Sequence, residues 1–459
     1  MGHTGSLLIR LLYNFLTAMK PYFILFAFLL SLTYGLQAQQ PPAHYLKAEK
    51  AVLEFLKAEG EASVQAFIDE AMKPAAVGDR QALLARLEAL RRDFKPYLQD
   101  VGIEGNPEGL LFLFSDGQQQ KNLFVALDQE GITELREQQP EPRLHITAEN
   151  LAAVIDSLEE RGMAGLVTVK KQGKALITRP FGMANAELGV PNSLNTIFGI
   201  GSRPIDFTVA AILLLDQQGK LSLDDPITRF FEAVPPDRQG MRIRHLMSGQ
   251  SGLPDFFDTE ADWDPDLAWV SRETAEQRLL HIPLLFEPGN EQQHSHAAFG
   301  LLAAIIERVS GMGYYAFIRK HFLDPAGMSR TGEYGEHRDL KLSDFAVGGG
   351  PEKVGLPNIP PNWGPTSWLV KGSGGMYSTL ADLRSFYRYV RSGQVLDAQH
   401  ARHFMGASVN LDGSMRGFEL FSISHPARDT EVYFFVNNLV DRKGFRQLIR
   451  GLEAFVRGE

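Results

Sequence analysis

The sequence predicts an α+β protein in which a small α+β domain precedes a larger one, and three features carry this prediction. Several segments have apolar residues that recur every three or four positions, the spacing of one face of a helix. Pairs of β-rich runs are joined by short polar turns, as in antiparallel hairpins. A polar stretch with two prolines, at residues 136–147, separates the two sets of elements and is typical of a linker.

Residues 1–38 are expected to be a signal peptide. Lys20 follows Met19, an apolar run extends from about Tyr22 to Leu32, and the small residue Ala38 precedes two glutamines. Met19 is an alternative start of the chain. A retained membrane anchor is the other interpretation, but an apolar core this short does not span a bilayer comfortably. We therefore expect an exported protein, periplasmic or extracellular, with no stable membrane span after cleavage.

Composition excludes several classes of function. The formal net charge is −9, and removing residues 1–38, which hold two basic and no acidic residues, makes it −11. An acidic chain without a basic cluster is a poor binder of nucleic acid or anionic lipid. The chain has 0 cysteines, which excludes disulfides and thiol chemistry. The expected partners are a cell-wall peptide, a small ester or a protein.

The first mature domain is predicted over residues 39–136. Helical spacing covers residues 45–58 and 79–98, and residues 109–127 form a predicted hairpin around a Ser-Asp-Gly turn. This domain carries no cluster of candidate catalytic groups, so we interpret it as an accessory module. Residues 137–147 are the predicted linker.

The larger domain, residues 148–459, begins with a predicted helix at 149–162 and a strand hairpin at 163–182. Ser202 then precedes an apolar helix, FTVAAILLLDQQG, that is predicted to be buried. Ser202 is placed as the N-cap of this helix, with Pro204 in the first turn. A serine at the mouth of a buried helix can present its hydroxyl in a cleft, where helix amides favour negative charge. Its simpler interpretation is a cap alone.

The segments from Ser202 onward, with IRHLMSGQSGLPDFF, FEPGNEQQHSHAAFG, KGSGGMYSTLADL and LDGSMRGFEL, resemble the serine β-lactamase and D-alanyl-D-alanine carboxypeptidase family. The chain is most similar to the penicillin-binding-protein-like branch that contains class C β-lactamases and esterases. The resemblance covers about residues 147–459. It implies a β-lactamase/transpeptidase-like fold, with an antiparallel sheet flanked by helices and a helical subdomain.

The motifs of that family are degraded in this chain. Its Ser-x-x-Lys element falls on Ser202 and Ile205, so the nucleophile remains and the lysine base is lost. Its Tyr-Ser-Asn element begins at His294 and ends at His296. Its His-or-Lys, any residue, Gly element begins at Leu411, which removes a cationic or proton-sharing side chain.

Two neighbouring elements complete the resemblance. It implies that Asp412, Gly413 and Ser414 lie on the oxyanion side of the cleft. The framework His-Thr-Ser-Gly element becomes Gly-Gln-Ser-Gly at residues 249–252, and the segment before Leu411 is short for the family.

Three hypotheses follow. The first is a catalytically impaired pseudoenzyme that binds a peptidoglycan-like, peptide or protein ligand. The second is an active serine hydrolase, most plausibly an esterase, in which Ser202 uses His294 or His296 as its base. A base of this kind needs an acid to orient its ring, and Asp206 and Asp412 are the nearest candidates by motif position. The third is an interaction protein whose N-terminal domain carries the function.

Other conspicuous groups have structural interpretations. His294 and His296 lack an evident third ligand, so no metal site and no cofactor are predicted. The run SGLPDFFD is interpreted as turn chemistry. The acidic run DTEADWDPDLAWV is either a lid over the cleft or a packed surface loop.

Overall fold

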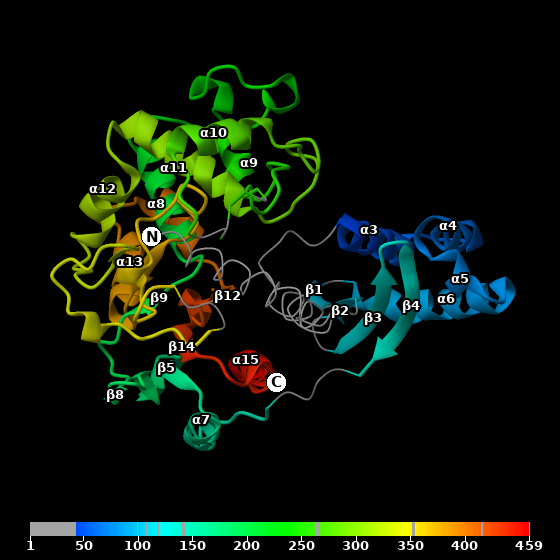
Figure 1. The fold of residues 1–459 in the computed structure, drawn as a ribbon, viewed down its shortest axis with the longest axis horizontal. Helices are drawn as coiled ribbons and strands as arrows, with labels where there is room; N and C mark the ends of the chain where they lie inside the picture. The colour runs from blue at the N-terminus through cyan, green and yellow to red at the C-terminus, as the bar shows by residue number, and fades with distance from the viewer. Residues whose placement is uncertain are drawn as a thin grey trace, which may run out of the picture. The chain divides into compact units, whose positions relative to one another are not determined.

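The computed structural model describes residues 43–458, apart from residues 99, 107–108, 117–118, 140–143, 260, 263, 265–266, 351–353 and 415. The predicted signal peptide, residues 1–38, lies outside the described residues. The chain divides into two compact units, Met1–Pro140 and Glu141–Glu459 (Figure 1). This division falls inside the predicted linker, although the last strand of the first unit extends to Gln138.

The first unit packs helices on an antiparallel sheet with the strand order β1-β2-β3-β4. The helices are α3 (Ala43–Lys57), α4 (Glu61–Ala71), α5 (Pro74–Val77) and α6 (Arg80–Phe94), and the strands are β1 (Asp100–Asn106), β2 (Gly109–Ser115), β3 (Gln120–Asp128) and β4 (Gly131–Gln138). The side chain of Asp79 caps α6 by accepting two backbone N–H groups. Alternate residues of β2, among them Phe112 and Phe114, join the core of this unit.

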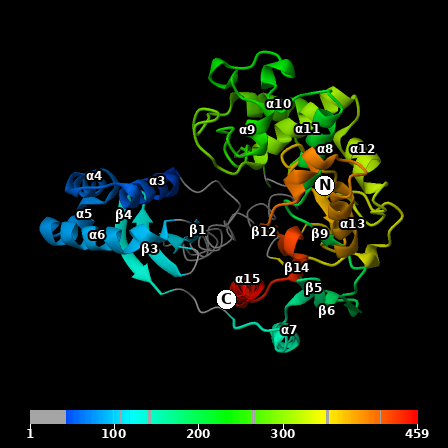
Figure 2. The ribbon, with the colours of Figure 1, turned by 180° about the vertical axis from the view of Figure 1, so that it is seen from behind.

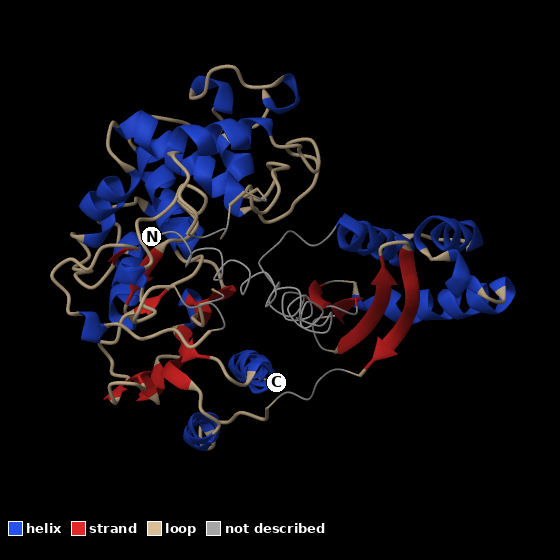
Figure 3. Ribbon diagram, viewed as in Figure 1, coloured by secondary structure: helices blue, strands red, loops and turns tan. Residues whose placement is uncertain are grey.

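The second unit is built on a five-stranded antiparallel sheet with the order β12-β13-β14-β5-β6. Figure 3 draws the strands in red among the blue helices. Its strands are β5 (Ala164–Lys171), β6 (Lys174–Phe181), β12 (Ser408–Gly413), β13 (Glu419–His425) and β14 (Thr430–Asn438). Helices α7 (Leu151–Glu160) and α15 (Arg442–Arg457) cover one face, and α8 (Pro204–Gln217) belongs to the core on the other (Figure 2). Strand β5 is therefore buried on both faces: Leu166 joins the core of α8, and Val167 joins the core of α7 and α15.

The helical part of the second unit surrounds α8. It contains α9 (Ile243–Met247), α10 (Arg272–His281), α11 (His296–Ser310), α12 (Tyr314–Ile318), α13 (Leu380–Arg391) and α14 (Ala398–Ala401). Small sheets are formed by β7 (Met183–Asn185) with β8 (Val190–Pro191), and by β9 (Phe198–Gly199), β10 (Gly332–Glu333) and β11 (Met376–Ser378). Helix α8 is buried from Phe207 to Leu215, which confirms the predicted burial.

The predicted α+β architecture, with an antiparallel sheet flanked by helices and a helical subdomain, is confirmed. Within the described residues, no single helix has both the length and the apolar character to cross a membrane. Among the described helices, the sharply bent pair 296–310 and 314–323 alone meets that test in combination. The first of these helices, α11, lies in the core of the second unit.

Candidate active site

Ser202 lies in the short link between β9 and α8. Gly201 precedes it with a positive φ of 53°, and a Cβ on Gly201 would lie 2.8 Å from the amide nitrogen of Gly413. The N-cap of α8 is Arg203, in helical conformation, and no side chain caps the helix. The predicted N-cap role of Ser202 is therefore wrong. Its hydroxyl instead forms a hydrogen bond with His296, with 2.8 Å between Oγ and Nε2.

His296 is the first residue of α11, and its backbone position is well defined. Ser295 is the N-cap of this helix: its hydroxyl accepts the Ala298 N–H and donates to the carbonyl of Pro254. The imidazole of His296 is stacked on the ring of Phe256, with 4.6 Å between centroids and 11° between planes. The helix start and the stacked ring together direct the imidazole at Ser202.

Asp255 completes a chain of three polar side chains. Its Oδ1 atom lies 2.6 Å from Nδ1 of His296 and also accepts the His296 backbone N–H at 3.0 Å. Burial raises the pKa of Asp255, but the hydrogen bond and the charge of His296 outweigh this effect and hold the pKa below its usual value. Asp255 therefore stays ionised at neutral pH, as an acid that orients a histidine should.

The two acids suggested by motif position do not orient His296. Asp412 forms a close ion pair with Arg203, whose side chain is 4% exposed. Asp206 accepts a hydrogen bond from Tyr387 and lies 3.5 Å from Arg203. Burial raises the pKa of Asp412, and the guanidinium of Arg203 opposes this rise. Both carboxylates belong to the surroundings of a buried arginine that sequence reasoning did not single out.

His294 lies beside His296 at the mouth of the site. The two rings meet edge to face, with centroids 4.6 Å apart, and the His294 side chain is exposed. Although the side chain reaches solvent, the atoms packed around its ring displace water, and this desolvation and the neighbouring His296 lower the pKa of His294 against the opposing effect of Asp255. Of the two predicted bases, His296 is the one that contacts Ser202.

Asp255 also supplies the third ligand that the sequence did not reveal. One ligand atom from each of Asp255, His294 and His296 lies within 4.8 Å of the other two. Two imidazoles and a carboxylate are a ligand set that suits a transition-metal ion. The prediction of no metal site rested on a missing third ligand, and the structure removes that reason.

The degraded motif positions carry no proton-transferring group. Ile205 packs partly buried against the core of the second unit and lines the cavity beside Ser202. Leu411 lies on β12 with its side chain 55% exposed at the rim of the cavity. Neither side chain can replace the amine or the cation that the family has at these positions.

Strand β12 brings a backbone amide to the serine. The Ser414 N–H donates to the Phe418 carbonyl at 2.9 Å, so Ser414 and Phe418 form a hydrogen-bonded pair. In an antiparallel ladder such pairs alternate along the strand, so the N–H of the adjacent residue, Gly413, points away from β13. It therefore points to the free edge of the sheet. That edge faces Gly201, next to Ser202. The Ser414 hydroxyl is buried without a hydrogen-bond partner among the described residues.

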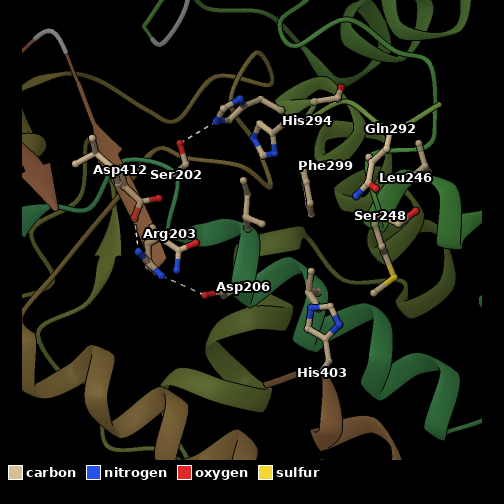
Figure 4. A pocket seen from close by; sticks show the side chains of 18 of the residues that line it. Ser202, Arg203, Asp206, Leu246, Ser248, Gln292, His294, Phe299, His403 and Asp412 are labelled. Atoms are coloured by element: carbon tan, nitrogen blue, oxygen red, sulfur yellow. Dashed lines mark hydrogen bonds and ion pairs between the residues drawn. The ribbon is translucent and has the colours of Figure 1, made fainter. Parts of the chain in front are cut away.

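Ser202 and His296 line a cavity of about 670 Å³ (Figure 4). Its polar residues come from the starts of α8 and α11, from β12 and from the segments that hold Ser248, Gln292 and His403, and its apolar residues come from α8, α9, α11 and β12. The apolar lining is Ile205, Val209, Leu246, Met247, Phe299, Val409 and Leu411. The only lysine or arginine in the described lining is Arg203, which is already paired with Asp412.

The acidic run at residues 258–270 packs on the protein in the part that the structure describes. Asp264 forms an ion pair with Arg416 at 2.5 Å, and Asp262 forms one with Arg278 at 2.6 Å. Leu267 is also buried. Of the two interpretations of this run, the packed loop fits these contacts.

Sequence reasoning missed Asp255. It lies 41 residues before His296 in the chain, inside a run interpreted as turn chemistry. The only signal in the sequence was its place three residues after Gly252, the last residue of the framework element. Because the contact is long-range, residue spacing did not indicate it.

Comparison with known proteins places the chain in a family. Residues 151–418 match the model of the family described as Beta-lactamase. The chain is 30% identical over 237 residues to Penicillin-binding protein 4* of Bacillus subtilis, covering 50% of this chain and 52% of that protein. It is 31% identical over 201 residues to Esterase EstB of Burkholderia gladioli, covering 40% and 51% respectively. The aligned region thus spans about half the length of each of these relatives.

Solved structures show the same fold at lower identity. A β-lactamase/D-alanine carboxypeptidase from Yersinia pestis, complexed with citrate, gives a TM-score of 0.55 at 18% identity, covering 68% of this chain and 99% of that chain. A penicillin-binding protein from Bacillus halodurans gives 0.52 at 23% identity, covering 66% and 99%. The fold expected from the sequence motifs is thereby confirmed.

Proposed function

The chain belongs to the Beta-lactamase family, and we propose that within it this protein is an active serine hydrolase that uses Ser202, His296 and Asp255 as nucleophile, base and orienting acid. One observation carries the proposal: the continuous hydrogen-bonded chain from Ser202 through His296 to Asp255, with separations of 2.8 and 2.6 Å. A free serine hydroxyl is a weak nucleophile, and this arrangement supplies the proton acceptor it needs.

The first half of the reaction forms an acyl-serine. Oγ of Ser202 attacks the carbonyl carbon of the substrate, and its proton passes to Nε2 of His296. The imidazolium that forms keeps its Nδ1 proton in the hydrogen bond to Asp255. The carbonyl oxygen becomes an oxyanion, for which the Gly413 N–H at the free edge of β12 and the Ser202 N–H are the candidate donors.

The second half releases the products. His296 gives its proton to the departing alkoxide, which leaves as an alcohol. Water then attacks the acyl-serine, His296 accepts the proton of that water, and the returning proton restores the Ser202 hydroxyl. The same three side chains therefore serve both halves of the reaction.

Esters with an uncharged acyl group are the substrate class that we assign to the cavity. Its lining mixes apolar side chains with polar ones, and the Arg203 charge is committed to Asp412. A free substrate carboxylate would find no uncommitted lysine or arginine among the described lining residues. The likeness to Esterase EstB supports the ester class. A second support is chemical, because ester leaving groups need less acid assistance than amines.

A pseudoenzyme that binds a peptidoglycan-like, peptide or protein ligand is the second candidate. The observation that favours it is the loss of the family's lysine and cation, at Ile205 and Leu411. Both candidates share one further proposal: the protein is exported, to the periplasm or beyond, through residues 1–38. The likeness to penicillin-binding proteins supports export.

Intact-protein mass spectrometry after exposure to a fluorophosphonate tests the first candidate. The wild-type protein should take up one adduct, and Ser202→Ala should take up none. Ser157→Ala, which changes an exposed serine on α7, is the matched control and should label like the wild type. His296→Ala should label much more slowly. A folded wild-type protein that takes up no adduct would overturn this proposal in favour of the pseudoenzyme.

A parallel experiment tests the substrate class. We expect hydrolysis of p-nitrophenyl butyrate by the wild-type protein and by Ser157→Ala, and none by Ser202→Ala. A labelled penicillin, which carries a free carboxylate, should acylate Ser202 far more slowly than the fluorophosphonate. Rapid labelling by the penicillin would contradict the assignment to uncharged esters.

A further inference from the structure

The cluster of Asp255, His294 and His296 has the composition of a metal site. Two imidazoles and one carboxylate come together with one ligand atom of each within 4.8 Å. In tetrahedral zinc sites the ligand atoms lie about 3.3 Å apart, since each lies about 2.0 Å from the ion. Closing this cluster onto an ion thus requires the ligand atoms to approach one another by at most about 1.5 Å.

His294 is the side chain that can make this shift. It is exposed, and residues 289–293 before it are exposed as well. On Asp255, the oxygen Oδ1 accepts both hydrogen bonds from His296, and no described residue donates to Oδ2. Oδ2 is therefore available as a ligand atom.

We propose that Asp255, His294 and His296 bind a divalent transition-metal ion such as Zn²⁺, and that the bound ion blocks the serine chemistry. The site has three protein ligands and leaves a fourth position open to water, an arrangement that Zn²⁺ commonly adopts. The second half of the proposal rests on the function proposed above, and the first half does not.

The blocking effect follows from the hydrogen bonds of His296. One ring nitrogen is bonded to Ser202 and the other to Asp255, so both are committed in the metal-free protein. An ion bound at Nε2 displaces the Ser202 hydroxyl from its proton acceptor. An ion bound at Nδ1 displaces the proton that holds the ring to Asp255. Either position removes the base that the reaction needs.

Direct metal binding is the first test, because it does not depend on activity. Tag-free protein is titrated with Zn²⁺ in competition with a chromogenic chelator, and with Co²⁺ while its visible absorption is followed. We expect one equivalent bound by the wild type and by Ser202→Ala. His294→Ala and His294→Gln should bind more than tenfold more weakly, because even outer-shell changes cost about 10–100-fold.

His281→Ala is the matched control, since His281 is an exposed histidine on α10 outside the cavity. It should bind the ion like the wild type. Equal affinities for the wild type and both His294 variants would overturn the proposed site, as would the absence of stoichiometric binding.

The second test joins the site to the reaction. Zn²⁺ should slow the labelling of Ser202 by fluorophosphonate in the wild type and in His281→Ala, but not in His294→Gln at the same concentration. Labelling that is unaffected by stoichiometric Zn²⁺ would overturn the blocking role. If no variant labels even without metal, the proposed function fails, and the binding titration still decides whether the site exists.

Discussion

Oδ1 of Asp255 accepts two hydrogen bonds from His296, one from the backbone N–H at 3.0 Å and one at the imidazole Nδ1 atom at 2.6 Å. The carbonyl of the same aspartate accepts the Ala297 N–H at 2.8 Å. One residue therefore anchors the start of α11 and orients the ring that the helix presents to Ser202. A change at Asp255 that preserves its shape should separate these two roles.

Asp255→Asn is expected to abolish most of the activity while the fold remains. Because one oxygen accepts both hydrogen bonds, an amide carbonyl in its place keeps them without the negative charge that stabilises the imidazolium. A flipped amide would instead donate to Nδ1 and so place the ring proton on Nε2, where Ser202 needs an acceptor. We expect kcat/KM for p-nitrophenyl butyrate to fall by about 10²–10⁴-fold, the usual value of general-base assistance. Asp324→Asn, at an exposed carboxylate, is the control. Unchanged turnover in Asp255→Asn would exclude Asp255 as the orienting acid.

Gly201→Ala should move β12 away from the serine. The positive φ at this position costs a non-glycine residue about 1–2 kcal/mol, and the added Cβ would lie 2.8 Å from the Gly413 nitrogen. Gly393→Ala is a matched control, because it has a φ of 79° and open space around the Cβ position. We expect both variants to lose stability, and only Gly201→Ala to lose fluorophosphonate labelling. Equal labelling of the two variants would show that β12 does not contribute.

Arg203 and Asp412 should be energetically coupled. Removing one member of a buried ion pair costs about 3–5 kcal/mol, because the other charge is left without its partner. We expect such losses in Arg203→Met and in Asp412→Leu, and a smaller loss in the double variant than the sum of the two. Urea unfolding followed by tryptophan fluorescence measures this, since all 4 tryptophans lie in the second unit. Additive losses would contradict the coupling.

Because of Glu419, the free energy of unfolding of this protein should depend on pH. Burial raises its pKa to about 7, with Arg442 opposing the rise. The unfolded carboxyl loses its proton near its usual pKa of about 4.3, whereas the folded one keeps it to about 7. Stability should therefore fall as the pH rises from about 4.5 to 7, by at most about 4 kcal/mol, and then level off.

Glu419→Gln removes the titrating group and should be more stable than the wild type at pH 8, with a smaller difference at pH 4.5. Urea unfolding at several pH values gives the comparison. If the free energies of unfolding of the wild type and Glu419→Gln change in parallel between pH 4.5 and 8, Glu419 ionises in the folded state as it does in the unfolded chain.

The sequence predicted the parts of this structure that depend on local pattern and motif order. The hairpin of β5 and β6, the buried helix α8 and the place of Ser202 before that helix all follow from residues near one another in the chain. The pairing of Ser202 with one of two histidines was among the hypotheses, because the motif order brings residues 294–296 to the serine.

What the sequence did not predict depends on long-range contacts. The pattern before α8 suggested a capping serine, but the link bends so that Arg203 is the cap and the hydroxyl reaches α11. Asp206 and Asp412 were favoured because they follow Ser202 and Leu411 in the motifs, yet a buried arginine binds both. Asp255 comes from a loop whose composition resembles an ordinary turn, and only the packing of that loop on α11 indicates its role.

The burial of α8 has a consequence for how this protein would lose activity. The amides of the helix segments enclosed from Phe207 to Leu215 and from Ala297 to Ile306 should exchange with solvent only when the whole unit opens, and Ser202 and His296 lie at the starts of these two helices. The exposed chain at residues 289–294, which leads into His296, can open at a much lower free energy. On warming, the exposed segment that carries His294 should thus loosen first, whereas the hydrogen bond between Ser202 and His296 should persist until the unit itself unfolds.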